Sequence, residues 1–196
     1  MEPSPSTSVL APGERDLLLS LARQSIERGL GLSRPADAPA VHGLPEPLRA
    51  TGASFVTLLG AQGLRGCRGA LEPLRPVAHD VWFNAWSSAF DDPRFPPLEA
   101  AELATLDIEV SLLSALEPLV VASEAELLAA LEPRRHGAVI ALGPHRATFL
   151  PQVWESLPEP SRFLGELKAK AGLPRGFWSS ELRAWRYTVE KLRAAA

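Results

Sequence analysis

The stretch FVTLLGAQGLRGCRGAL, residues 55–71, decides the fold of this chain. Its first part, residues 55–59, is apolar and contains Phe, Val and Thr, which favour β-strands. Residues 60–63 have the composition of a turn, and the chain then continues through residues 64–71. The pattern predicts a β-hairpin with a four-residue loop.

The second strand of this hairpin contains the only cysteine of the chain, Cys67. Regular alternation would put Arg65 and Cys67 on one face of the strand. Gly66 and Gly69 weaken a strand, so they predict a bulge or a close approach by another group. An arginine beside a thiol favours the reactive thiolate, whereas a free cysteine more often packs as a small apolar residue. A functional thiol and an inert core cysteine are both open at this point.

The length and composition describe an ordinary soluble protein. With 196 residues the chain suits one compact domain, which can have two lobes. The net charge of −3 argues against a nucleic-acid or anionic-membrane binder. One cysteine excludes an internal disulfide and fits a reducing compartment. The first residues have no pattern of a signal peptide, and no apolar run reaches the roughly 18 residues of a membrane span, so we expect a cytoplasmic protein.

The remaining sequence intersperses helix and strand patterns. Residues 1–12 are rich in Ser and Pro and predict a loose tail before a single domain over 13–196, and the proline-rich residues 33–47 predict an extended connector. Apolar periodicity and capping residues predict helices over 14–30, 76–90, 123–131 and 161–171, the last capped by Ser161, and strands over 106–113, 138–142, 147–150 and 184–192. The fold class is therefore α+β with a mixed or antiparallel sheet. The hairpin and strand 106–113 should share one sheet, since each has an apolar face.

The spacing of the polar residues excludes several cofactors. The four histidines form no i, i+4 pair and no zinc-finger spacing with Cys67. A single cysteine cannot hold an iron–sulfur cluster. Glycines recur every third residue over 60–69, but a dinucleotide fingerprint would lie between a strand and a helix, not across a hairpin. We therefore predict no cofactor and no metal.

Several motifs in order resemble one known family. They are Leu64-Arg65-Gly66-Cys67, Leu71-Glu72-Pro73, Asp92-Pro93-Arg94-Phe95-Pro96-Pro97-Leu98, Ile108-Glu109-Val110-Ser111, Arg135-His136-Gly137, Leu150-Pro151-Gln152-Val153 and Lys170-Ala171-Gly172-Leu173-Pro174. In this order they are similar to the AMMECR domain family, whose bacterial and archaeal members are called AmmeMemoRadiSam system protein A. The resemblance covers residues 55–192 and implies a two-lobed α+β domain.

The family name also implies partners. Members occur with, or are fused to, a Memo-like protein and a radical-SAM protein, so the resemblance implies a shared pathway with a small-molecule or protein-modification step. This chain departs from the family pattern at two positions. Arg68 stands where the family usually has an aliphatic residue, and Lys168 stands where many members carry a second cysteine. The second departure argues against a two-cysteine mechanism here.

Six polar residues in the matched stretches are the candidates for a site: Arg65, Cys67, Arg94, Glu109, His136 and Gln152. Cys67 could be a nucleophile, with His136 as its base or Glu109 as its orienting group. Arg65 and Arg94 could bind a carboxylate or phosphate, and Gln152 could contribute to ligand binding. A structural ion pair between Arg94 and Glu109 would explain those two residues equally well, and turn formation would explain His136.

Two hypotheses about function follow. In the first, a polar pocket centred on Cys67 binds or transforms a small molecule or a modified residue. In the second, the chain is a non-enzymatic adaptor for protein–protein interaction, and its polar cluster is structural. A pocket with converging polar groups supports the first hypothesis, and an exposed apolar patch supports the second. The expected sharing of one strand face by Arg65 and Cys67 favours the first.

Overall fold

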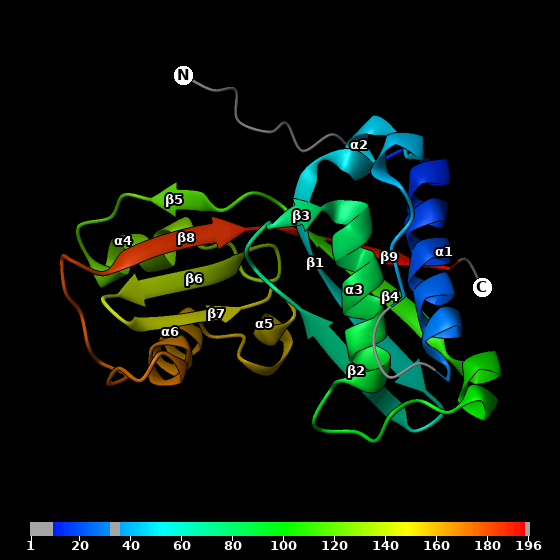
Figure 1. Cartoon of the computed structure of the whole chain (residues 1–196). Coiled ribbons are helices and arrows are strands. Elements are labelled where there is room, and N and C mark those ends of the chain that lie inside the picture. The colour runs from blue at the N-terminus through cyan, green and yellow to red at the C-terminus, as the bar shows by residue number, and fades with distance from the viewer. Residues whose placement is uncertain (1–9, 32–35, 195–196) are drawn as a thin grey trace. The chain divides into compact units, whose positions relative to one another are not determined.

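The computed structural model describes residues 10–31 and 36–194 and divides the chain into two compact units (Figure 1). Unit 1 comprises Met1–Leu113 together with Glu190–Ala196, and unit 2 comprises Ser114–Val189. The second unit is therefore inserted into the first along the sequence. The predicted α+β class is confirmed, with two antiparallel sheets where the sequence analysis expected one sheet.

Unit 1 consists of one sheet and its helices. Its elements are α1 (Pro12–Gly29), η1 (Val41–Gly43), α2 (Glu46–Arg49), β1 (Thr51–Gly60), β2 (Gly63–Gly69), β3 (Arg75–Pro76), α3 (Val77–Phe90), η2 (Ala100–Thr105), β4 (Asp107–Leu113) and β9 (Val189–Arg193). The strand order is β2-β1-β4-β9, and β3 pairs with the start of β1. The predicted sharing of one sheet by the hairpin and strand 106–113 is confirmed, because β1 pairs antiparallel with both β2 and β4.

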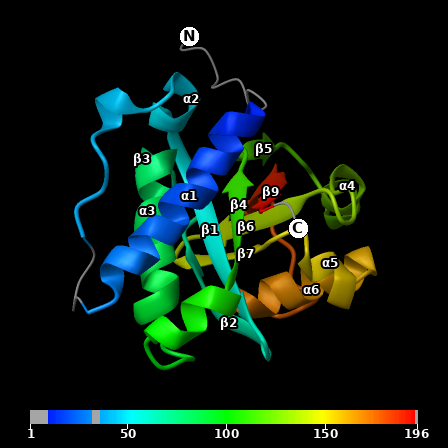
Figure 2. The same ribbon diagram turned by 90° about the vertical axis from the view of Figure 1, so that its right-hand side faces the viewer.

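Helices α1 and α3 lie side by side over one face of this sheet (Figure 2). Helix α1 contributes Leu18 and Ile26 to the core, and α3 contributes Val81 and Trp82, all with no exposed surface. Alternate strand residues complete the same core: Val56, Leu58, Ile108, Val110 and Leu192. Burial of each large apolar side chain stabilises the fold by about 1.5–3 kcal/mol. This packing fixes which strand residues face the helices and which face away.

The hairpin of β1 and β2 has a tighter turn and a less regular ladder than the sequence predicts. Only Ala61 and Gln62 separate the strands, and Gly63 has a φ of 98° that favours glycine. Leu58 pairs with Gly66 and Leu59 pairs with Leu64, so Arg65 is an extra residue on β2. Such a β-bulge is what the glycines of this strand predicted.

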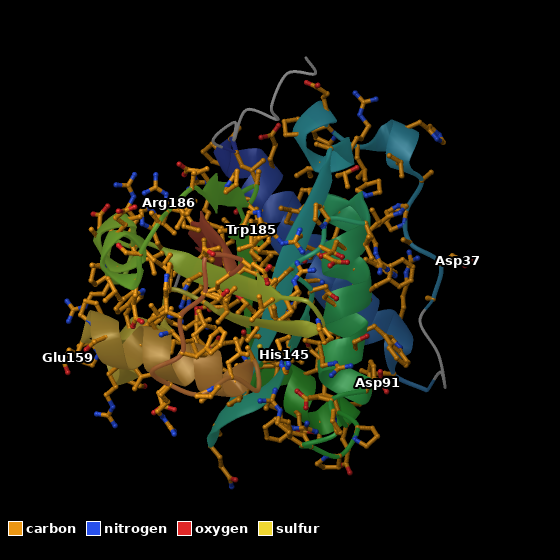
Figure 3. The ribbon with its side chains drawn as sticks, turned by 90° about the vertical axis from the view of Figure 1, so that its left-hand side faces the viewer. Asp37, Asp91, His145, Glu159, Trp185 and Arg186 are labelled. Carbon is orange, nitrogen blue, oxygen red and sulfur yellow. The ribbon has the colours of Figure 1, made fainter. Side chains whose placement is uncertain are left out.

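Unit 2 contains a four-stranded sheet with three helices. Its elements are β5 (Glu117–Leu119), α4 (Glu124–Ala130), β6 (Gly137–Leu142), β7 (His145–Phe149), α5 (Val153–Ser156), α6 (Pro160–Lys170) and β8 (Arg183–Tyr187), in the sheet order β5-β8-β6-β7. Figure 3 labels Glu159 directly before α6 and Arg186 on β8. The core contains Trp154 stacked on Phe163 with ring centroids 3.7 Å apart. Unit 2 thus has its own hydrophobic core.

Most predicted elements are present, with two corrections. The predicted strand over 184–192 is two strands, β8 in the sheet of unit 2 and β9 in the sheet of unit 1. They are separated by Thr188, whose N–H donates to Ser114 Oγ (2.9 Å). Ser161 lies inside α6, which follows Glu159, and does not cap it. The capping serine predicted at Ser123 is confirmed, since its Oγ accepts from the N–H of Glu126.

The N-terminal predictions are only partly covered by the described residues. Residues 1–9 of the predicted tail lie outside them, whereas Leu10 is buried in the core of unit 1. Residues 33–35 of the predicted connector also lie outside them. The described part of the connector includes η1 and the start of α2, and the main-chain oxygen of Ala36 accepts from Trp82 Nε1 (3.1 Å). Within the described residues, no helix is long and apolar enough to span a membrane.

Candidate functional site

The main chain of Cys67 is bound on both sides by charged groups. Its N–H donates to Asp92 Oδ2 (2.9 Å), and its C=O accepts from Arg94 Nη2 (3.2 Å). Arg94 also pairs with Asp92, with Nη2 2.7 Å from Oδ2 and Nε 2.9 Å from Oδ1. We call these two side chains the Asp92–Arg94 clamp. They satisfy the two outward main-chain groups of an edge strand as a neighbouring strand would.

The clamp follows from the sequence of the loop after α3. That helix ends at Phe90, its C-cap is Asp91 (labelled in Figure 3), and Pro93 follows Asp92. The Arg94 hydrogen bond is the main cause that lowers the pKa of Asp92 well below its ordinary value, and the Cys67 N–H adds to it. Asp92 is buried and stays ionised at neutral pH. The expected Arg94–Glu109 ion pair is therefore replaced by one between Arg94 and Asp92.

Arg65 does not lie on the face of Cys67, because the bulge interrupts the alternation. A Cβ placed on Gly60 would lie 3.7 Å from Arg65 Cβ, and Gly60 lies two residues from the core residue Leu58 on β1. Arg65 therefore points to the helix-covered face of the sheet. There its Nε lies 2.6 Å and its Nη2 3.0 Å from the carboxylate of Glu102, and this pairing lowers the pKa of Glu102.

Cys67 belongs instead to a polar row on the face of the sheet that lies away from α1 and α3. Thr57 on β1 pairs in register with Cys67 on β2 and with Glu109 on β4. Thr57 Oγ1 donates a hydrogen bond to Cys67 Sγ at 3.4 Å. Residues directly opposite on neighbouring strands share one face. The order across the three strands is thus thiol, hydroxyl, carboxylate, and we call these side chains the Cys67–Thr57–Glu109 row.

The carboxylate end of the row is neutralised by β9. Arg193 Nε donates to Glu109 Oε2 (2.6 Å), and Lys191 Nζ lies 3.4 Å from Oε1. Glu109 is 5 % exposed, so its charge is nearly removed from bulk water. A buried carboxylate needs such partners. Glu109 therefore has a structural function in joining β4 to β9, in addition to its place in the row.

His136 and Gln152 lie in unit 2, whereas the other four candidates lie in unit 1. His136 Nδ1 accepts from the N–H of Glu132 (3.0 Å), so a ring proton of neutral His136 is on Nε2. Burial, followed by the charges of Arg186 and Arg135, lowers the pKa of His136 and favours the neutral form. The free acceptor nitrogen is thus used to close a turn, as the second interpretation of this residue expected.

Gln152 immediately precedes the short helix α5, and its C=O accepts from the N–H of Glu155 (3.0 Å). Within the part of the chain that the structure describes, its side-chain Oε1 is buried and has no hydrogen-bond partner. In the same part, no group of three or more His, Cys, Asp or Glu side chains could hold a metal ion.

The two departures from the family pattern have separate surroundings. Arg68 is exposed, and its main-chain N–H donates to Ser88 Oγ (2.9 Å), so the extra charge lies at the surface. Lys168 is fully buried on α6, with Nζ 2.8 Å from Oε2 of Glu124, the first residue of α4. In this chain Lys168 thus forms an ion pair between two helices.

Sequence reasoning missed Thr57, Asp92, Lys191 and Arg193. Thr57 is the only polar residue of the apolar run 55–59, and Asp92 opens a matched motif, so both carried a signal. Lys191 and Arg193 alternate with the core residue Leu192, which indicates that they share a face. The pairing of β9 with β4 spans about 80 residues of sequence and left no local signal.

This fold and these motifs define a family. The family model described as AMMECR1 matches residues 19–192, and the chain belongs to the AMMECR1 family. A protein from Methanothermobacter thermautotrophicus is 36% identical over 189 residues, which are 92% of this chain and 95% of that protein. A protein from Thermotoga maritima is 36% identical over 154 residues, 76% of this chain and 83% of that one.

A solved structure has the same fold. The crystal structure of the uncharacterized protein PH0010 from Pyrococcus horikoshii matches with a TM-score of 0.81 and 30% sequence identity. The match covers 93% of this chain and 92% of that chain. The resemblance expected from the motifs is thus confirmed for the family and the fold.

Proposed function

We propose that this chain binds or transforms a small molecule or a modified residue at a polar site centred on Cys67. The proposal rests on one observation: the main chain of Cys67 is fixed by the Asp92–Arg94 clamp while its thiol faces a hydroxyl group. Cys67 is partly exposed and belongs to neither hydrophobic core. An inert core cysteine would instead pack among apolar side chains.

The residues that contribute to the proposed site differ from those that the sequence predicted. Cys67 is its centre, and Glu109 is the acidic group of the same sheet face. Arg65 and Arg94 have their charges paired with Glu102 and Asp92, so they support the local structure of β2. The proposed chemistry therefore uses the Cys67 thiol and its neighbours in the Cys67–Thr57–Glu109 row.

Alkylation of Cys67 tests this proposal, because it is the only thiol of the chain. We expect iodoacetamide to modify Cys67 in the folded protein, with a single mass increase in the intact-mass spectrum. The Cys67→Ala variant is the matched control and should gain no mass. Full protection of Cys67 until denaturant is added would refute the thiol site and favour the non-enzymatic adaptor hypothesis.

The family resemblance also supports the proposal that this chain works with a Memo-like protein and a radical-SAM protein. A Memo-like protein and a radical-SAM protein encoded in the same genome as this chain can be purified and mixed with it. Size-exclusion chromatography with light scattering then measures the mass of any complex. A complex of defined mass is the expected result. Separate elution of all three proteins at micromolar concentration would contradict a stable assembly and leave only a pathway connection.

A further inference from the structure

We infer that Thr57 is a positioning residue of the Cys67 site: its hydroxyl donates a hydrogen bond to the sulfur and holds the thiol in the polar row. This inference rests on the proposed function of Cys67 and adds a residue to it. Thr57 and Cys67 come from opposite strands of the hairpin, and the bond between them is 3.4 Å long.

The register of the sheet places Thr57 at the centre of the row. It is opposite Cys67 on one side and opposite Glu109 on the other. Two strand spacings of about 4.8 Å separate the main chains of Cys67 and Glu109, so Thr57 is the group between them. Its neighbours on β1, Val56 and Leu58, point into the core of unit 1. Thr57 therefore lies on the opposite face from the core and is hydrogen-bonded to the thiol.

The effect of the Thr57 hydroxyl group can be separated by mutation from the packing of the Thr57 side chain. Valine has the shape of threonine and favours strands equally well, so packing alone does not require an oxygen atom here. A hydroxyl donates one hydrogen bond. A hydrogen bond from the Thr57 hydroxyl fixes the direction of the sulfur atom and keeps it in the polar row. Its loss should slow every reaction in which the thiolate is the nucleophile.

Alkylation kinetics of three variants test the inference. The thiolate attacks the methylene carbon of iodoacetamide, a carbon–sulfur bond forms, the carbon–iodine bond breaks and iodide leaves. We expect Thr57→Val to lower the rate at pH 7 by about threefold to tenfold, the effect of one hydrogen bond. Thr57→Ser keeps the hydroxyl and should restore the rate.

Thr51→Val is the matched control, because Thr51 is an exposed threonine on the same strand and its substitution should leave the alkylation rate unchanged. Thr57→Ala replaces Thr57→Val if the latter does not fold by circular dichroism. If the folded wild type is alkylated and Thr57→Val reacts at the same rate, the inference is overturned and the proposed function stays intact. Complete protection of the folded wild type would overturn both.

Discussion

Gly66 and Gly69 must be glycine because of space, not because of backbone conformation. Neither has a positive φ. A Cβ at Gly66 would collide with the main-chain oxygen of Ser88, and one at Gly69 would collide with the main-chain oxygen of Ser54 and with the ring of Phe55. Main-chain atoms cannot move aside without shifting α3 or β1.

We therefore predict that Gly66→Ala and Gly69→Ala each lower the free energy of unfolding by more than about 1 kcal/mol. Chemical denaturation followed by circular dichroism measures the change. Gly176→Ala is the control, since a Cβ there would meet nothing within 4 Å and the φ is not positive. Equal stability of all three variants and the wild type would show that the close approach at β2 does not constrain the fold.

Asp92 gives a pH-dependent prediction at the same scale. Its pKa in the folded chain is lowered below its ordinary value of 3.8, mainly by Arg94. A carboxyl group whose pKa is lower in the folded state than in the unfolded state stabilises the fold. This stabilisation is fully present above the unfolded-state pKa, and it is lost as the pH falls through the folded-state pKa. Asp92→Asn should thus cost about 2 kcal/mol at pH 7, the value of a hydrogen bond to a charged group.

The difference between Asp92→Asn and the wild type should narrow as the pH falls below about 4. Denaturant unfolding at a series of pH values provides the measurement. Asp91→Asn is the control, because Asp91 is adjacent, exposed and not part of the clamp. Its free energy of unfolding should differ from that of the wild type by less than about 0.5 kcal/mol. A difference in free energy of unfolding between Asp92→Asn and the wild type that stays constant with pH would contradict an ionised Asp92 in the clamp.

At the scale of elements, the edges of both sheets are protected in different ways. The clamp binds the outer main-chain groups of β2 at Cys67. In unit 2, Pro118 interrupts the edge strand β5, and Lys170 Nζ donates to the main-chain oxygen of Thr148 on β7 (3.0 Å). An unprotected edge is a template for pairing with other chains. The clamp thus leaves the main-chain groups of Cys67 unavailable for such pairing.

The two partners of the ion pair between α4 and α6 differ in burial, so replacing each of them should change stability by a different amount. Lys168 is fully buried, whereas the side chain of Glu124 is 34% exposed. Glu124→Gln leaves an ammonium group buried without its counter-charge and should cost about 3 kcal/mol. Lys168→Met fills the same space without a charge and should change stability by less than about 1 kcal/mol, or increase it.

Thermal and denaturant unfolding of both variants provide the comparison, and the double variant should resemble Lys168→Met. The solvent-exposed pair of Arg175 and Glu166 is the control, because a surface pair contributes about 0–1 kcal/mol. Lys168→Met being the more destabilised of the two single variants would mean that the ion pair, and not the desolvated lysine, dominates this contact.

At the scale of the whole molecule, local patterns predicted the elements better than their partners. The stripes of α1 and α3 and the alternation of β4 are local, and each predicts its element. Strand β5 was missed because three residues that include a proline form no pattern. The alternation of Trp185, Tyr187 and Val189 continues across Thr188, so the sequence did not show that β8 and β9 belong to different sheets.

The candidate site was predicted in part for the same reason. Cys67 and Glu109 lie on one sheet face as strand alternation allows, but Arg65 does not, because a bulge reverses the face of the residue that it inserts. Arg94 pairs with a residue two positions away, which local sequence could have suggested. The partners of Glu109 come from β9, and only the sheet order reveals them.

Removal of β9 should affect the two units unequally. A variant without residues 190–196 loses the strand beside β4 and the two cations that neutralise Glu109. We expect the amides of β4 and β1 to exchange at least about tenfold faster, while those of β6 and β8 keep their protection. Hydrogen–deuterium exchange with mass spectrometry resolves both sets.

A variant without residues 194–196 keeps β9 and is the control for shortening the chain. It should exchange like the wild type in both units. Faster exchange over β6 and β8 in the longer deletion, to the same extent as over β4, would mean that the two units unfold as one and would contradict their description as separate cores.

The position of β9 in the sequence also determines the order in which the protein can mature on the ribosome. All of unit 2 is synthesised before the strand that completes the sheet of unit 1. At elongation rates of about 5–20 residues per second, the nascent chain spends several seconds with β4 unpaired on one side and Glu109 without its cations. Unit 2 is continuous in sequence, and its last strand, β8, is synthesised directly before β9. The unit that leaves the ribosome first is therefore finished last, and β4 is the segment at which a chaperone would find the nascent chain open.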